Sequence, residues 1–146
     1  MSGSPGRALR LAHRGDWRRA PENTLAAMTA ALAVAGCDGL EFDVRGSSDG
    51  VPVVLHDASL QRVQGVDALV TSLTASELER HGVPTLSAVL TAVGRAPFLD
   101  VELKGRPVDA VVDVLEAGRG PHLDRTVVSS FEPPTVAWLG RLRPAW

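Results

Sequence analysis

The stretch GLEFDV, residues 39–44, decides the fold class because its apolar and acidic side chains alternate. Successive side chains of a β-strand point to opposite faces, so three apolar residues share one face while Glu41 and Asp43 share the other. At about 3.3 Å per residue, the two acids lie about 6.6 Å apart, close enough for both carboxylates to reach one ion. Two acids on a strand are more often a solvated face. Parallel strands in α/β folds are covered on both sides, however, so inward-directed acids need a partner.

A second stretch, FLDVELKG at residues 98–105, repeats the arrangement. Its apolar residues share one face, and Asp100, Glu102 and Lys104 share the other. Glu102 and Lys104 could form only a surface ion pair, which contributes little. A second inward acidic row instead favours a shared cation, and ligands that are all oxygen suit Mg²⁺, Mn²⁺ or Ca²⁺ rather than Zn²⁺. Lys104 is the sole lysine of a chain with 15 lysines and arginines, and a compact ammonium suits a place beside an anion.

Strand-like and helix-like segments alternate along the chain, which is typical of parallel βα units. We expect strands at residues 8–13, 39–44, 51–56, 98–103 and 126–131. We expect helices at residues 24–35, from 74 onward, and at 86–93, 108–118 and 134–143. Asn23 is a plausible N-cap of the first helix, and Thr74 with Glu77 matches a capping box for the second.

Two architectures fit this order of elements, an open doubly wound sheet and most of a (β/α)8 barrel. No Gly-x-Gly-x-x-Gly or Walker-type loop follows a strand, which disfavours a nucleotide-binding doubly wound sheet. The chemically interesting residues lie at the carboxyl ends of strands, where barrel enzymes keep their sites. We therefore expect an α/β fold of the (β/α)8 TIM-barrel type, with about the first five βα units present in one partial domain, residues 1–146.

Two histidines also lie at expected strand ends. His13 ends the first strand and His56 the third, where Asp57 follows it. A lone histidine is more often structural, but two beside carboxylates make an acid and base pair plausible, because imidazole titrates near neutrality. His81 and His122 lie in loop or helix-end positions and receive no role.

Composition narrows the range of partners. The chain has 146 residues, 45% of them hydrophobic, which is enough for one globular domain with a core. A net charge of −2 gives no field that would draw nucleic acid or an anionic membrane, so we expect neither partner. Cys37 is the single cysteine, and no signal-peptide core or spanning apolar run is evident, so a cytoplasmic location is expected.

Several motifs occur together in one order. AHRG (12–15), PENT (21–24), GLEFDV, DGVPVVLHD (49–57), ELK (102–104) and VVSSF (127–131) follow one another along the chain. Their combination and order resemble the glycerophosphodiester phosphodiesterase family from about Leu11 to Phe131. The combination is far more specific than any single motif.

The resemblance implies a first part of a (β/α)8 barrel that hydrolyses glycerophosphodiesters to glycerol 3-phosphate and an alcohol, within lipid and glycerol metabolism. It implies that His13 and His56 are the general acid and base, and that Arg14 holds the phosphate. A divalent cation, Mg²⁺ or Ca²⁺ with Mn²⁺ as a further candidate, would be bound by Glu41, Asp43 and Glu102. Lys104 would lie against the substrate phosphate or its oxyanion, while Glu22 and Asn23 would support the first loop or the metal shell.

Two departures from the family pattern matter. After the LHD segment the chain keeps an arginine, Arg62, but lacks the threonines that often follow it in the family. A complete barrel typically takes about 250 residues, and the family's tryptophan-bearing last strand is missing here. Open sheet edges would permit self-association. Two functions stay open, a metal-dependent phosphodiesterase acting on a small-molecule glycerophosphodiester, and a truncated, non-catalytic module that binds metal or phosphate.

Overall fold

The computed structural model describes residues 6–105 and 109–146. Its centre is a sheet in which four strands lie parallel in the order β1-β2-β4-β5. These strands are β1 (Leu11–His13), β2 (Gly39–Gly46), β4 (Phe98–Leu103) and β5 (Thr126–Ser129). The expected α/β fold is confirmed, and the parallel order is that of a partial (β/α)8 barrel.

The remaining strand, β3 (Pro52–Val54), departs from the expected pattern. It pairs antiparallel with β2, with Val44 opposite Val54. Only the turn at residues 47–51 separates β2 from β3, whereas a parallel partner needs a crossover of about a dozen residues or more. The prediction of a parallel strand over 51–56 is therefore wrong, and His56 follows β3 in a loop.

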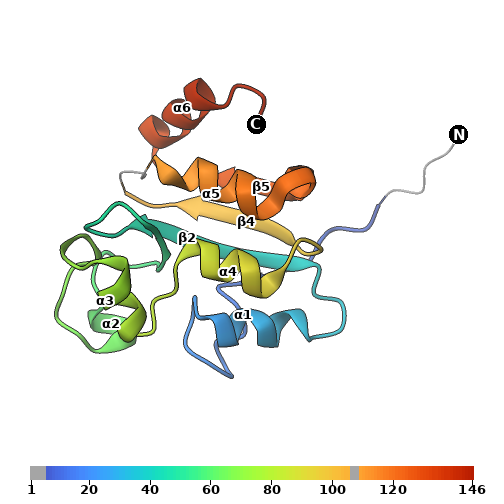
Figure 1. The fold of residues 1–146 in the computed structure, drawn as a ribbon. Coiled ribbons are helices and arrows are strands. Elements are labelled where there is room, and N and C mark those ends of the chain that lie inside the picture. The colour runs from blue at the N-terminus through green and yellow to red at the C-terminus, as the bar shows by residue number, and fades with distance from the viewer. Residues whose placement is uncertain (1–5, 106–108) are drawn as a thin grey trace, which may run out of the picture.

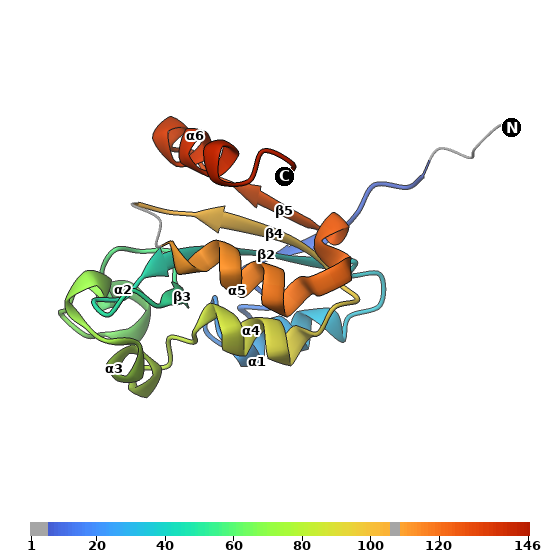
Figure 2. The same cartoon turned by 45° about the horizontal axis from the view of Figure 1, so that its top comes forward.

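Helices cover one face of the sheet. In Figures 1 and 2, α1, α4 and α5 lie on the same side of β2 and β4, while α6 lies beside β5. The α-helices are α1 (Leu25–Leu32), α2 (Gln61–Gln64), α3 (Ala75–Arg80), α4 (Leu86–Val93), α5 (Ala110–Arg119) and α6 (Pro133–Leu142). Two 3₁₀ helices are η1 (Val70–Ser72) and η2 (Gly120–Arg125). Val108, which the sequence pattern includes in the fifth helix, lies outside the described residues.

The main core lies between the sheet and helices α1, α4 and α5. The apolar residues of GLEFDV all face it, and Leu40 and Phe42 are fully buried. Strand β4 repeats the pattern, because its residues alternate between buried and half-buried along its whole length. The alternation predicted from the sequence is confirmed, and the opposite face of β2 and β4 is left for polar side chains. A second apolar cluster fills the segment from β3 to α4.

The cap of α1 differs from the expected one. Thr24 is the N-cap, since its hydroxyl oxygen accepts from the Ala27 amide. Asn23 instead adopts φ 58° and donates its side-chain amide to Asp43 at 3.0 Å. Asn23 as the N-cap is therefore wrong, because its side chain is used at the polar face of the sheet. The capping box of Thr74 and Glu77 is confirmed.

No helix in the described ranges is long and apolar enough to cross a membrane.

Candidate active site

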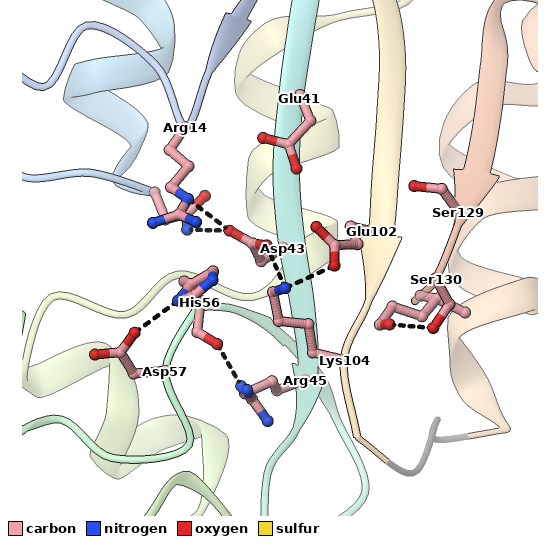
Figure 3. A network of polar contacts seen from close by, with 12 residues as sticks. Arg14, Glu41, Asp43, Arg45, His56, Asp57, Glu102, Lys104, Ser129 and Ser130 are labelled. Carbon is pink, nitrogen blue, oxygen red and sulfur yellow. Dashed lines mark hydrogen bonds and ion pairs between the residues drawn. The ribbon is translucent and has the colours of Figure 1, made fainter. Parts of the chain in front are cut away.

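The polar face of the sheet brings together the three predicted metal ligands. In the strand register, Asp43 of β2 lies opposite Glu102 of β4, and Glu41 lies one alternation earlier on the same face. One carboxylate oxygen from each of the three residues lies within 4.8 Å of the others. Figure 3 shows these carboxylates side by side above the sheet. Parallel pairing of two acidic strands thus creates a cluster that neither strand would form alone.

Some oxygens of the carboxylate cluster accept no hydrogen bond from the described residues. Within residues 6–105 and 109–146, Glu41 Oε2 and Asp43 Oδ1 are buried and accept no hydrogen bond. Burial and the charges of Asp43, Glu102 and Asp100 raise the pKa of Glu41 to about 7. Buried acceptors without donors are costly, and a hard divalent cation is the partner that carboxylate oxygens prefer. The residues therefore fit a site for Mg²⁺, Mn²⁺ or Ca²⁺.

Cationic side chains surround Asp43, which is fully buried. Arg14 Nε lies 3.1 Å from Asp43 Oδ2, and Lys104 Nζ lies 3.5 Å from Asp43 Oδ1. Lys104 also donates to Glu102 at 2.6 Å. Two cations beside an acidic cluster at the carboxyl ends of parallel strands can bind an anionic group while the acids hold a metal.

The first loop, residues 14–24 between β1 and α1, is fixed by its own backbone. The backbone amide of Arg14 donates to the Glu41 carbonyl at 2.8 Å, and the Arg14 carbonyl accepts from the backbone amide of Asn23 at 3.0 Å. Arg14 and Asn23 are the two non-glycine residues with positive φ in the described part of the chain, at 60° and 58°. Glu22 accepts from Arg14 Nη1 at 3.2 Å. The predicted supporting residues Glu22 and Asn23 are thus brought to Arg14 and Asp43, in a strained turn of the kind that clusters at functional sites.

The two histidines approach the site from different elements, His13 from a strand end and His56 from a loop. His13 ends β1, and its Nε2 lies 3.5 Å from Glu41 Oε2, with 66% of its side chain exposed. His56 holds its Nδ1 2.7 Å from Asp57 Oδ1. The edge of the His56 ring away from Asp57 points to the side on which Asp43 and Lys104 lie in Figure 3.

The structure adds residues that the sequence patterns did not single out. Arg45, next on the polar face of β2, donates its Nε to the His56 carbonyl at 2.8 Å. Ser129 of β5 donates to Asp100 at 2.8 Å. The alternation of β2 could have indicated Arg45, because it shares a face with Glu41 and Asp43. Nothing in the sequence indicated the Ser129 contact, which depends on the β4–β5 register.

Comparisons with known proteins agree with the geometry. The family model described as "Glycerophosphoryl diester phosphodiesterase family" matches residues 13–135. A glycerophosphodiester phosphodiesterase of Caldanaerobacter subterraneus subsp. tengcongensis is 34% identical over 67% of this chain and 46% of its own length. Glycerophosphodiester phosphodiesterase 1 of Mus musculus is 40% identical over 89% of this chain and 44% of its own. The chain thus spans about half the length of these two curated relatives.

Solved structures extend the likeness to the fold. The glycerophosphodiester phosphodiesterase of Agrobacterium tumefaciens matches with a TM-score of 0.86 and 30% identity, over 96% of this chain and 65% of its own. An Oleispira antarctica phosphodiesterase in complex with sn-glycerol-3-phosphate matches with a TM-score of 0.71 and 28% identity, over 94% of this chain and 63% of its own. With 123 of 146 residues inside the family match, the chain belongs to the glycerophosphoryl diester phosphodiesterase family.

Proposed function

We propose that this chain carries the metal- and phosphate-binding part of an enzyme that hydrolyses glycerophosphodiesters to glycerol 3-phosphate and an alcohol. The observation that supports this most directly is a pair of buried oxygens, Glu41 Oε2 and Asp43 Oδ1, which accept no hydrogen bond from the described residues. They lie in a cluster flanked by Arg14 and Lys104. The substrate would be a small-molecule glycerophosphodiester, as the family match and the product-bound relative suggest. A cytoplasmic location is part of the proposal.

Charge neutralisation is the first task of such a site, because a phosphodiester monoanion repels nucleophiles. Glu41, Asp43 and Glu102 would hold a divalent cation, which supplies Lewis-acid stabilisation of charge on the phosphoryl oxygens when bound. Arg14 and Lys104 would bind the phosphate oxygens directly. Glu22 and Asn23 would keep the Arg14 turn in place through the contacts described above.

Proton transfer is the second task. One of His13 and His56 would take the proton from the attacking oxygen as its bond to phosphorus forms. The other would donate a proton to the alcohol oxygen as its bond to phosphorus breaks. The attacking oxygen would belong either to water or to the neighbouring glycerol hydroxyl. A placed acid or base of this kind contributes about 10²–10⁴-fold to rate.

Hydrolysis of glycerophosphocholine by the purified chain, with Mg²⁺, Ca²⁺ or Mn²⁺ added, tests the proposal. We expect turnover that EDTA abolishes and that falls by about 100-fold or more in His13→Ala. His122→Ala is the matched control and should retain full activity. Cation binding without turnover in the wild-type chain would instead establish the second candidate, a non-catalytic module that binds metal or phosphate.

Calorimetric titration tests the ligand assignment separately. We expect the wild-type chain to bind a divalent cation, and Glu41→Ala and Asp43→Ala to lose that binding. Asp113→Ala, which removes a carboxylate from the exposed face of α5, is the control. Equal affinity in the wild type and in the two cluster variants would contradict the assignment.

A further inference from the structure

A continuous series of ion pairs joins the first loop to the loop after β3. Arg62, at the start of α2, lies between Glu22 of the first loop and Asp57 of the second. It donates to Asp57 through Nε at 2.7 Å and Nη2 at 2.9 Å. It donates to Glu22 through Nη2 at 2.6 Å and Nη1 at 3.2 Å. Both carboxylates are therefore bound by two nitrogens of one planar guanidinium.

Each carboxylate has a second partner that belongs to the candidate active site. Glu22 also accepts from Arg14, which lies against Asp43. Asp57 also contacts Nδ1 of His56 at 2.7 Å. Arg62 holds the pKa of Asp57 and of Glu22 below their usual ranges, so both stay ionised acceptors at neutral pH. The side chains of Glu22 and Asp57 are mostly buried, at 16% and 26% exposure, beneath the half-exposed Arg62.

The contact with Asp57 fixes the state of the His56 ring. An ionised carboxylate can only accept a hydrogen bond, so Nδ1 of a neutral His56 must carry the hydrogen. Nε2 then carries the lone pair, and the ring edge away from Asp57 is the one that points to the site in Figure 3. Arg45 holds the His56 carbonyl at 2.8 Å, so the residue is fixed at both its backbone and its ring.

We propose that Arg62 is a positioning residue, which holds Asp57 against His56 and Glu22 against Arg14 so that Nε2 of His56 faces the bound phosphate as a proton acceptor. The role of His56 in this statement rests on the proposed function, whereas the ring state does not. Lysine could not replace the arginine, because a single ammonium cannot bind two carboxylates in parallel pairs. An ordinary surface ion pair would predict the opposite result, that loss of Arg62 leaves the His56 ring unchanged.

The ring state of His56 can be read directly by NMR. Long-range ¹H–¹⁵N correlation spectra of the full chain distinguish protonated from unprotonated ring nitrogens, and only four histidines contribute. The His56 signals are assigned by their loss in His56→Gln. Spectra are recorded at about pH 8, above the ordinary titration range of imidazole. The measurement needs neither metal nor turnover, so its result is independent of whether the chain hydrolyses phosphodiesters.

We expect the wild-type spectrum to show His56 with the hydrogen on Nδ1. Arg62→Met should lose this pattern and show a mixture of the two tautomers, and Arg62→Lys should lie between the two. Arg143→Met is the matched control, because Arg143, directly after α6, donates to Glu116 of α5 through two nitrogens at 2.6 and 3.0 Å. It should leave the His56 signals unchanged.

The proposal is overturned if folded Arg62→Met or folded Arg62→Lys keeps the wild-type His56 pattern, or if wild-type His56 carries its hydrogen on Nε2. Backbone amide spectra show which variants are folded. If Arg62→Met does not fold, the His56 pattern of Arg62→Lys decides whether the proposal holds. Where hydrolysis is measurable, kcat should fall by about 10- to 100-fold in Arg62→Met, with KM changed by less than about threefold. An unchanged kcat would likewise count against a positioning role.

Discussion

At the scale of single residues, the carboxylate cluster disfavours the charged form of Glu41. Its pKa of about 7 in the folded chain lies above the ordinary value of 4.5, because burial and neighbouring acids disfavour the charged form. Between these two values the folded chain holds a proton that the unfolded chain has released. The contribution of Glu41 to the stability of the metal-free protein therefore falls as the pH rises from about 4.5 to 7, and the loss is complete above 7.

Glu41→Gln removes this penalty. In the metal-free protein we expect the variant to gain stability relative to the wild type as the pH rises, reaching about 1–3 kcal/mol at pH 8. Urea unfolding of both proteins at several pH values gives the difference in their free energies of unfolding. The effects of the other acids cancel in this difference. A difference that stays flat between pH 4.5 and 8 would contradict the raised pKa. Added Mg²⁺ or Ca²⁺ should stabilise the wild type and not the variant.

The sequence predicts the strand residues of the site better than its loop residues. Glu41, Asp43 and Glu102 can be identified because alternation alone places them on one face, and a parallel register then brings them together. Residue type and position favour Asn23 as a helix cap, which it is not. Its side chain reaches Asp43 only because the backbone takes a left-handed conformation there, which no periodicity reports.

At the scale of elements, the turn after β1 depends on close contact with α1. Gly15 has φ 84°, and a Cβ there would lie 2.6–2.8 Å from backbone atoms of Ala27 and Met28. We expect Gly15→Ala to cost at least about 3 kcal/mol, because both the conformation and the contact oppose a methyl group. Gly50→Ala is the matched control.

Gly50 has a similar φ of 76°, but no atom of the described residues lies within 4 Å of the place that a methyl group would take. Its replacement should therefore cost only about 1–2 kcal/mol. Chemical denaturation gives both values. Equal losses would show that conformation alone, and not the packing of the turn on α1, limits Gly15. Gly15→Ala should also weaken cation binding, since the turn carries Arg14 and Asn23 to Asp43.

Apart from α2, which the sequence pattern did not indicate, the α-helices and parallel strands follow from the sequence, but the direction of β3 does not. VPVVLHD is apolar enough to suggest a strand, and the alternating pattern of the whole chain suggests a parallel one. The direction is set by the short turn at 47–51, and the pairing ends at Val54. His56 is therefore held by Asp57 and Arg45 instead of by strand pairing.

Arg119 shows how elements on the side away from the candidate site are held together. It is fully buried at the end of α5 and donates to Thr126 of β5 and to the carbonyls of Gly94 and Pro97. We expect Arg119→Met to cost about 2–4 kcal/mol in urea unfolding, because these acceptors would lose a charged donor. Arg125→Met, which removes an exposed arginine bonded to a single carbonyl, should change stability by less than about 1 kcal/mol. A similar loss in both variants would argue against a special role for the buried guanidinium.

At the scale of the whole molecule, the sheet has two open edges. Within residues 6–105 and 109–146, β1 and β5 each pair with only one other strand. A groove of about 610 Å³ lies along β5 and α6, and its lining includes the exposed side chains of Val127, Val136 and Trp146. Unpaired strand edges with apolar side chains favour association between chains.

We therefore expect the chain to self-associate with increasing concentration, and Val127→Lys to weaken the association by placing a charge at the β5 edge. Leu69→Lys is the matched control, because Leu69 is similarly exposed, at 54% against 47%, but lies before η1 and away from both edges. Sedimentation equilibrium over the micromolar to millimolar range measures the effect. A monomeric wild type over this range, or equal weakening by both lysines, would show that the β5 edge does not drive association. Weakening by Val127→Lys alone would instead assign the contact to the β5 edge, since both lysines add the same charge and only one of them lies at an unpaired strand.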